Sequence, residues 1–145
     1  MIEASNEALE TAQRVKASMW ARDRTAQALG MTIEAVGVGT SRVRMIVREE
    51  MLNGHDSCHG GMIFSLADTA FAYACNSHNP INVAQQCSIS FLARAVRGDE
   101  LAAVAQERHR GKRSGLYDVT VSKADGTVVA LFRGTSAQLQ GLNVE

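Results

Sequence analysis

The chain is poor in several residue types, and each shortage argues against a class of protein. Only 5% of its 145 residues are aromatic, and it contains a single proline and three cysteines. Three widely spaced cysteines, an odd number, suit reduced cytosolic thiols better than a disulfide framework. Fifteen basic and fifteen acidic side chains cancel, so no global field attracts nucleic acid or an anionic membrane.

Long apolar runs are missing as well. No stretch approaches the roughly 18 apolar residues of a membrane-spanning helix, and the N-terminus lacks the apolar centre of a signal peptide. We therefore expect a cytoplasmic protein without a nucleic-acid or membrane partner. The length suits a single domain over residues 1–145.

Hydrophobic periodicity predicts an N-terminal helical segment of about 1–28. An amphipathic helix is expected within residues 5–28, and Gly30 should end it. Alternating apolar residues over 31–35 and 43–47 then predict a β-hairpin. The apolar alternation in its first strand falls on Met31, Ile33 and Ala35.

Further strands follow the only proline. Pro80 should restart the chain as an extended segment, and alternation predicts strands around 83–91, 101–105 and 117–121. A turn at Asp125-Gly126 leads to a last strand near 127–139. Two strands, a buried helix and four strands with short connections favour an α+β fold, in which a curved antiparallel sheet of five to six strands surrounds one central helix.

The most informative stretch is the predicted buried helix after His59-Gly60-Gly61. It is apolar on almost every side, and its polar exceptions lie on one stripe: Ser65, Asp68 and Thr69. A buried carboxylate needs a partner or a raised pKa, which makes Asp68 a candidate acid, base or nucleophile. The structural alternative is that Asp68 bonds to nearby backbone or caps a neighbouring segment.

The two glycines at the start of this helix offer a second functional group. Their free N–H groups would form an oxyanion site, helped by the helix dipole. Gly61 and Asp68 are seven residues apart, about 10 Å along the axis, which is too far for both to grip one reacting carbon. Two antiparallel helices across a two-fold axis would bring the groups together, so we expect a dimer with shared sites.

The whole chain resembles the hotdog-fold thioesterases, specifically the phenylacetate-degradation type of acyl-coenzyme A thioesterase. The resemblance is carried by Asn53, by HGG at 59–61 and by an aspartate eight residues after the first glycine. It implies hydrolysis of aryl-acetyl thioesters such as phenylacetyl- or hydroxyphenylacetyl-coenzyme A, by a homodimer or a homotetramer of paired dimers. No metal or redox cofactor is implied.

The resemblance also assigns roles to individual positions. The Gly60 amide would polarise the thioester carbonyl, and Asp68 would act as general base on water or as nucleophile. Asn53 would help to position substrate or water, and His59 would support the loop. Thr69 matches a hydroxyl that orients the aspartate or its water. The groups suit thioester hydrolysis, which needs an activated oxygen nucleophile and stabilisation of the oxyanion.

Substrate-binding residues are expected in two places. Basic residues around a glycine-bearing turn could hold the coenzyme A phosphates, the alternative being a solvated hairpin tip: Arg108, Arg110, Lys112 and Arg113. The acyl pocket should lie along the helix flank near Gly61, with Leu52, Phe64 and Phe71 as candidate lining residues or as plain core.

Other functions would use some of the same residues. His55, Cys58 and His59 could suggest zinc, but a fourth ligand is missing, and Cys58 as a nucleophile lacks an orienting partner for the histidine. A hydratase of the same fold would carry a histidine where Tyr73 stands. A non-catalytic acyl-coenzyme A sensor is a further alternative, although no DNA-binding segment is present.

Overall fold

The computed structural model describes residues 4–145, and the first three residues of the predicted helical segment lie outside this range. Two strands, one long helix and four strands follow an N-terminal pair of helices, and the order from the first strand onward is the predicted one. The elements are α1 (Asn6–Trp20), α2 (Arg24–Ala28), β1 (Thr32–Gly37), β2 (Thr40–Ile46), the short 3-10 helix η1 (Glu49–Met51), α3 (Gly60–Asn76), β3 (Pro80–Phe91), β4 (Glu100–Arg110), β5 (Ser114–Lys123) and β6 (Val128–Leu142).

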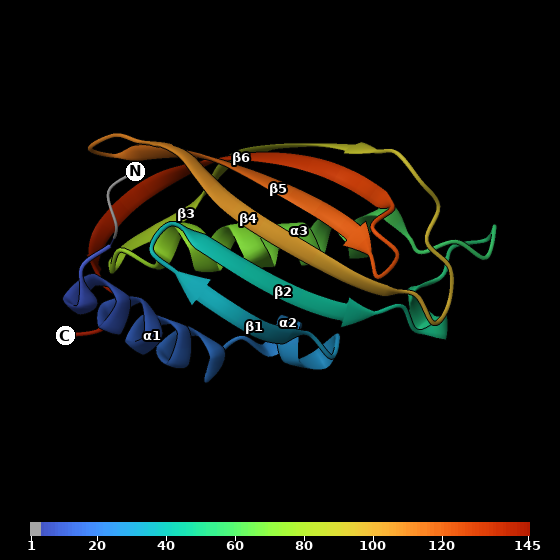
Figure 1. Ribbon diagram of the computed structural model, residues 1–145, viewed down its shortest axis with the longest axis horizontal. Helices are drawn as coiled ribbons and strands as arrows, with labels where there is room; N and C mark the ends of the chain where they lie inside the picture. The colour runs from blue at the N-terminus through green and yellow to red at the C-terminus, as the bar shows by residue number, and fades with distance from the viewer. Residues whose placement is uncertain (1–3) are drawn as a thin grey trace.

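One curved sheet wraps around α3 (Figure 1). Its strand order is β1-β2-β4-β5-β6-β3, and every neighbouring pair is antiparallel. The inner face and α3 together form the core, with Leu66 and Phe71 almost completely buried. Burial contributes about 1.5–3 kcal/mol for each such side chain, so the helix is firmly held. This is the α+β architecture expected from the sequence, the hotdog fold.

The N-terminal segment differs from the single predicted helix. It breaks after Trp20, and Asp23 begins a second helix because its carboxylate accepts a hydrogen bond from the Ala26 amide at 3.2 Å. The other oxygen of Asp23 accepts from the Tyr73 hydroxyl at 3.1 Å, which ties the break to α3. A long-range contact therefore selects the position of the break, which helical periodicity could not show.

The prediction that Ala35 faces the core in the first strand is wrong. A β-bulge between Ile33 and Ala35 changes the alternation, so Ala35 is exposed and Val36 takes the inward position instead. The predicted hairpin itself is confirmed, with Val43 and Met45 of β2 buried.

The two sheet edges are covered differently. α1 lies along β1 (Figure 1), whereas β3 forms the other edge. Val83 and Phe91 of β3, and Leu92 just after it, expose 43%, 51% and 57% of their surface. Such an edge presents unpaired backbone groups to another chain. No helix within residues 4–145 is long and apolar enough to span a bilayer.

Candidate active site

The start of α3 leaves one backbone amide free. The imidazole Nδ1 of His59 accepts a hydrogen bond from the Gly61 amide at 2.8 Å, and the His59 carbonyl accepts from Met62 and Ile63. Across residues 4–145, no protein group accepts the Gly60 N–H. The expectation of two free glycine amides is therefore wrong for Gly61, and Gly60 alone offers a donor at the positive end of the helix dipole.

The Gly60 amide borders a hollow of about 500 Å³, the amide pocket. Its lining residues are Asn53, Ser57, Cys58, Gly60, Ile63, Phe91, Leu92, Ala93, Arg94 and Ala95. The aromatic ring of Phe91 lies so close that a Cβ at position 60 would be 3.0 Å from it. The exposed Phe91 ring would have to move by a few tenths of an ångström to admit a larger residue.

The loop before α3 is held by Asn53. Its side-chain oxygen accepts hydrogen bonds from the amides of His55 and Ser57, at 2.9 and 3.2 Å. The side chain that the sequence assigned to substrate or water thus lies in the amide pocket and also shapes the loop. Leu52, expected in the acyl pocket, pairs with Cys58 in an isolated bridge and packs against the core.

Asp68 lies two turns further along α3. Its carboxylate has no hydrogen-bond partner among the described residues, so the alternative in which it bonds to nearby backbone is wrong. Partial burial removes water from the carboxylate and raises the pKa of Asp68 above its ordinary value. A carboxylate with a raised pKa is a stronger base than a solvated one, as a general base requires.

Asp68 borders a second hollow of about 340 Å³, the carboxylate pocket. Its lining is largely apolar and comes from four parts of the chain: Met19, Asp68, Phe71, Ala72, Cys75, Asn76, Ile81, Asn82, Val83, Ala84 and Asn143. Met19 and Asn143 come from opposite ends of the sequence, which is why local motifs could not identify them. Burial raises the pKa of the Cys75 thiol to about 12, and the nearby Asp68 adds to this, so no second charge forms there.

The polar neighbours of Asp68 are bonded to the helix. The Ser65 hydroxyl donates to the Gly61 carbonyl at 2.8 Å, and the Thr69 hydroxyl donates to the Ser65 carbonyl at 2.7 Å. Thr69 therefore keeps only acceptor capacity toward a water near Asp68. Phe64 packs edge-on against Phe132, with ring centroids 5.4 Å apart, and lines neither the amide nor the carboxylate pocket.

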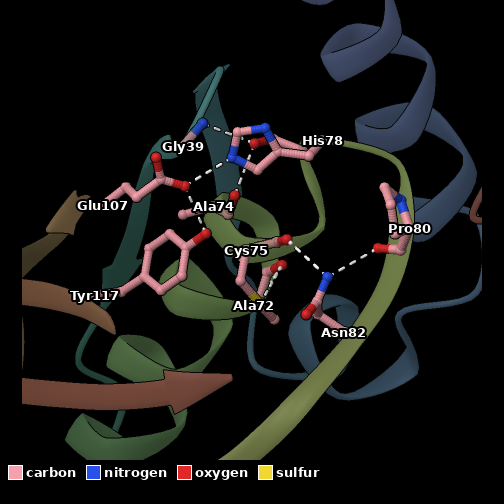
Figure 2. A network of polar contacts seen from close by, with 10 residues as sticks. Gly39, Ala72, Ala74, Cys75, His78, Pro80, Asn82, Glu107 and Tyr117 are labelled. Atoms are coloured by element: carbon pink, nitrogen blue, oxygen red, sulfur yellow. Dashed lines mark hydrogen bonds and ion pairs between the residues drawn. The ribbon is translucent and has the colours of Figure 1, made fainter. Parts of the chain in front are cut away.

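The C-terminal end of α3 is densely bonded (Figure 2). Glu107 of β4 accepts from the Tyr117 hydroxyl at 2.8 Å and lies 2.7 Å from Nε2 of His78. Burial acts to raise the pKa of Glu107, but the hydrogen bonds from His78 and Tyr117 outweigh it and lower the pKa overall. The side-chain amide of Asn82 adds bonds to the carbonyls of Cys75 and Pro80.

The predicted basic cluster is divided between two surfaces. Arg108 lies 3.4 Å from Asp118, and Arg133 donates two hydrogen bonds to the same carboxylate. These three residues line a hollow of about 560 Å³, largely on the sheet face away from α3. Lys112 and Arg113 instead occupy the β4–β5 hairpin, beyond the C-terminal end of α3 (Figure 1). This hollow therefore contains neither Gly60 nor Asp68.

The alternative chemistries have specific structural outcomes. Burial, and the nearby Asp99, raise the pKa of the Cys58 thiol to about 11, so it is a poor nucleophile at neutral pH. Within the described part of the chain, no three His, Cys, Asp or Glu side chains are grouped to hold a metal ion. Tyr73, where a hydratase would have histidine, is buried and donates to Asp23.

Comparison with known proteins agrees with this geometry. The model of the thioesterase superfamily matches residues 55–130, which include both Gly60 and Asp68. The chain is 50% identical to the acyl-coenzyme A thioesterase PaaI of Escherichia coli K12 over 86% of its own length and 89% of that protein. The chain therefore belongs to the thioesterase superfamily and, within it, to the PaaI-type acyl-coenzyme A thioesterases.

Solved structures extend the comparison. The E. coli PaaI protein from the phenylacetic acid degradation operon superposes with a TM-score of 0.92 at 47% identity, covering 93% of this chain and 98% of that one. A Streptococcus mutans protein bound to acetyl CoA superposes with a TM-score of 0.73 at 28% identity, covering 75% and 88%. A relative of this fold thus holds an acyl thioester of coenzyme A.

Proposed function

We propose that this protein is a cytoplasmic thioesterase that hydrolyses aryl-acetyl-coenzyme A, with each active site formed by two protomers of one domain each. Phenylacetyl- and hydroxyphenylacetyl-coenzyme A are the proposed substrates. One observation carries the proposal: a free backbone amide and an unpartnered carboxylate lie on one helix but in different pockets. Gly60 and Asp68 are eight residues apart, about 12 Å along the helix axis.

The two pockets border opposite ends of the same edge strand. Residues 81–84 at the start of β3 line the carboxylate pocket, and Phe91 at its end lines the amide pocket. Antiparallel pairing of two β3 edges about a two-fold axis would place the start of one strand beside the end of the other. The carboxylate pocket of one protomer would then meet the amide pocket of its partner.

The exposed surface along β3 supports such pairing. Val83, Phe91 and Leu92 would become buried, and the unpaired backbone groups of β3 would complete a continuous sheet. We extend the proposal to a tetramer of paired dimers. The sheet face away from α3 carries exposed Val104 and Leu131, which a second dimer would cover.

Hydrolysis by these groups follows from their chemistry. Asp68 takes a proton from water as the water oxygen attacks the thioester carbon, and the Gly60 amide donates to the oxyanion that develops. When the intermediate collapses, the carbon–sulfur bond breaks and the thiolate of coenzyme A accepts the proton. Direct attack by Asp68 would instead form a mixed anhydride and release the thiolate, and water would then cleave the anhydride at the aspartyl carbon. A single turnover in ¹⁸O-labelled water distinguishes the routes, because only direct attack leaves label in Asp68.

The relatives and the pocket chemistry support an aryl substrate. The E. coli protein is described as part of a phenylacetic acid degradation operon. The carboxylate pocket adds an apolar wall with an aromatic ring, formed by Met19, Phe71 and Val83, which suits a flat apolar acyl group. Lys112 and Arg113 are the proposed contacts for the coenzyme A phosphates. Release of free thiol from a panel of aryl and aliphatic thioesters measures this preference.

Subunit complementation tests the shared site. Asp68→Asn removes the base, and Gly60→Pro removes the amide hydrogen while keeping a residue that suits the first helical position. Gly60→Ala is the matched control, because it adds a Cβ but keeps the N–H. If the site is shared, co-expressing the two inactive chains in equal amounts restores about a quarter of wild-type activity, since half of the dimers carry one intact site. No recovery would contradict the shared arrangement.

A further inference from the structure

Arg94 connects the two loops that frame the amide pocket. Its guanidinium donates from Nε to the Ser57 hydroxyl and from a terminal nitrogen to the carbonyls of His55 and Asp56, at 2.9 and 3.3 Å. Arg94 itself belongs to the loop between β3 and β4. The two loops lie together beyond the N-terminal end of α3 (Figure 1). Arg94 is thus a tie between segments almost 40 residues apart in the chain.

The loop held by Arg94 leads directly to Gly60. Its other hydrogen bonds to the rest of the protein lie at its base, where the Cys58 amide donates to the Ala95 carbonyl at 2.8 Å and the His59 amide donates to the Met51 carbonyl. The outer part, residues 54–56, is exposed, and Asp56 has a φ of 56°. Asp56 adopts a conformation that L side chains rarely take, and it is held by a hydrogen bond to Asn53 within the loop and by Arg94 from outside it.

Arg94 also provides the fixed charge of this pocket. The other lining side chains are apolar or uncharged, and the Cys58 thiol stays protonated at neutral pH. Three of the N–H groups of Arg94 are directed at the loop, and a guanidinium has five. The planar fork is what allows one side chain to hold a hydroxyl and two carbonyls together, and a lysine ammonium lacks this geometry.

We propose that Arg94 is a positioning residue that holds the 53–59 loop so that the Gly60 amide points at the thioester carbonyl. This inference rests on the proposed function. The amide acts on negative charge that develops only in the transition state, so misplacing it slows turnover and leaves ground-state binding almost unchanged. Displacements of about 1 Å in an active site can cost up to about 100-fold in rate.

Kinetics of Arg94→Ala and Arg94→Lys test the proposal, with Arg97→Ala as the matched control. Arg97 belongs to the same loop but makes only an exposed contact with Glu49 at 3.7 Å. We expect kcat to fall about tenfold in both Arg94 variants, with KM within about twofold. Arg97→Ala should behave as wild type. Guanidinium ions should restore part of the kcat of Arg94→Ala and leave Arg94→Lys unchanged.

A second substrate separates positioning from phosphate binding. An acyl N-acetylcysteamine thioester has the reacting group but no phosphates, and the kcat loss should be the same with it as with acyl-coenzyme A. A rise in KM for acyl-coenzyme A alone would overturn the proposal, as would an unchanged kcat. Activity of wild type and Arg97→Ala in the same assay tests the proposed function separately, because those two proteins keep the loop contacts of Arg94.

Ser57→Ala keeps the test decisive if the Arg94 variants fold poorly. This change removes only the hydroxyl that accepts from Nε of Arg94. It should lower kcat by a smaller factor, and adding Arg94→Ala should bring the loss no further than Arg94→Ala alone. Independent, multiplying losses would show that the two residues do not act through one contact and would overturn the proposal.

Discussion

The two halves of α3 treat their polar groups in opposite ways. From Gly60 to Asp68 the helix keeps an amide and a carboxylate that no protein group within residues 4–145 satisfies. At and just beyond its C-terminal end, polar groups are joined to other segments: Ser77 accepts from the Gly39 amide in the β1–β2 turn, His78 contacts Glu107 of β4, and Asn82 of β3 donates to the Cys75 carbonyl. Unsatisfied, partly buried polar groups cost stability. In the proposed function, the first half carries the chemistry and the second half supports it.

Replacing Asp68 should have the largest effect and should separate activity from stability. Asp68→Asn is expected to lower kcat by about 10²–10⁴-fold, because the general base is lost. It should also raise Tm, because a group whose folded pKa is raised makes its ionised form costly at neutral pH. Asp125→Asn, in the exposed β5–β6 turn, is the control: it should leave kcat unchanged and should not raise Tm, because the hydrogen bond from the Thr127 amide lowers the pKa of Asp125. Retained turnover would remove Asp68 from the mechanism.

The pH dependence of kcat should also show the raised pKa of Asp68. Asp68 must be ionised to act as a base, and its pKa is raised, so kcat should fall on acidification at a pH above the ordinary aspartate range. Below that pKa, the rate should drop about tenfold per pH unit. Steady-state rates in constant-ionic-strength buffers measure the acid limb. An acid limb at the ordinary aspartate pKa would mean that Asp68 is solvated in the working enzyme.

Removing the hydrogen bonds of Glu107 near the C-terminal end of α3 should lower the stability of the protein and leave kcat unchanged. Glu107→Gln is expected to cost about 1–3 kcal/mol of unfolding free energy, because His78 and Tyr117 lose a charged acceptor. Since its folded pKa is lowered, the contribution of Glu107 is present at neutral pH and lost as pH falls through that pKa. Urea unfolding measures both, with exposed Glu100→Gln as control. An equal loss of kcat would contradict the division between the halves.

The smallest effect is expected for Lys112 and Arg113 in the β4–β5 hairpin. Lys112→Gln combined with Arg113→Gln should raise KM for acyl-coenzyme A by about two- to fivefold, as expected for exposed charge contacts. KM for the phosphate-free N-acetylcysteamine thioester should stay unchanged. If both values stay unchanged, the hairpin is a solvated tip and the supporting half of the molecule has no part in substrate binding.

Local patterns were sufficient for most of the fold. Apolar alternation at Val43 and Met45 and the turn at Asp125-Gly126 predicted strands that the structure contains, because side chains alternate strictly between the faces of a sheet. The missed features are long-range. The break before α2 depends on Tyr73 reaching Asp23, and the bulge that turns Ala35 outward depends on pairing with β2.

The sequence likewise predicted some residues of the candidate site and missed others. Gly60 and Asp68 were identifiable because an acid inside an apolar helix and a glycine pair at its start are local anomalies, whereas Asn53 was identified only through the family resemblance. Arg94 carries no such signal, since its partners lie in another loop. Whether the Gly61 amide was free could not be read from the sequence either, because the orientation of the His59 ring settles it.

The amino-acid order alone sets the periodicity of the strands, the burial of the central helix and the types of chemical group along it, since each depends on neighbours within a few residues. The arrangement of the site is determined only by the tertiary structure. The separation of Gly60 and Asp68 into two pockets at opposite ends of β3, and the tie from Arg94 to the loop before Gly60, arise from contacts between distant segments. Such contacts form only when the sheet closes around the helix, because the energy of packing, and not local preference, selects them.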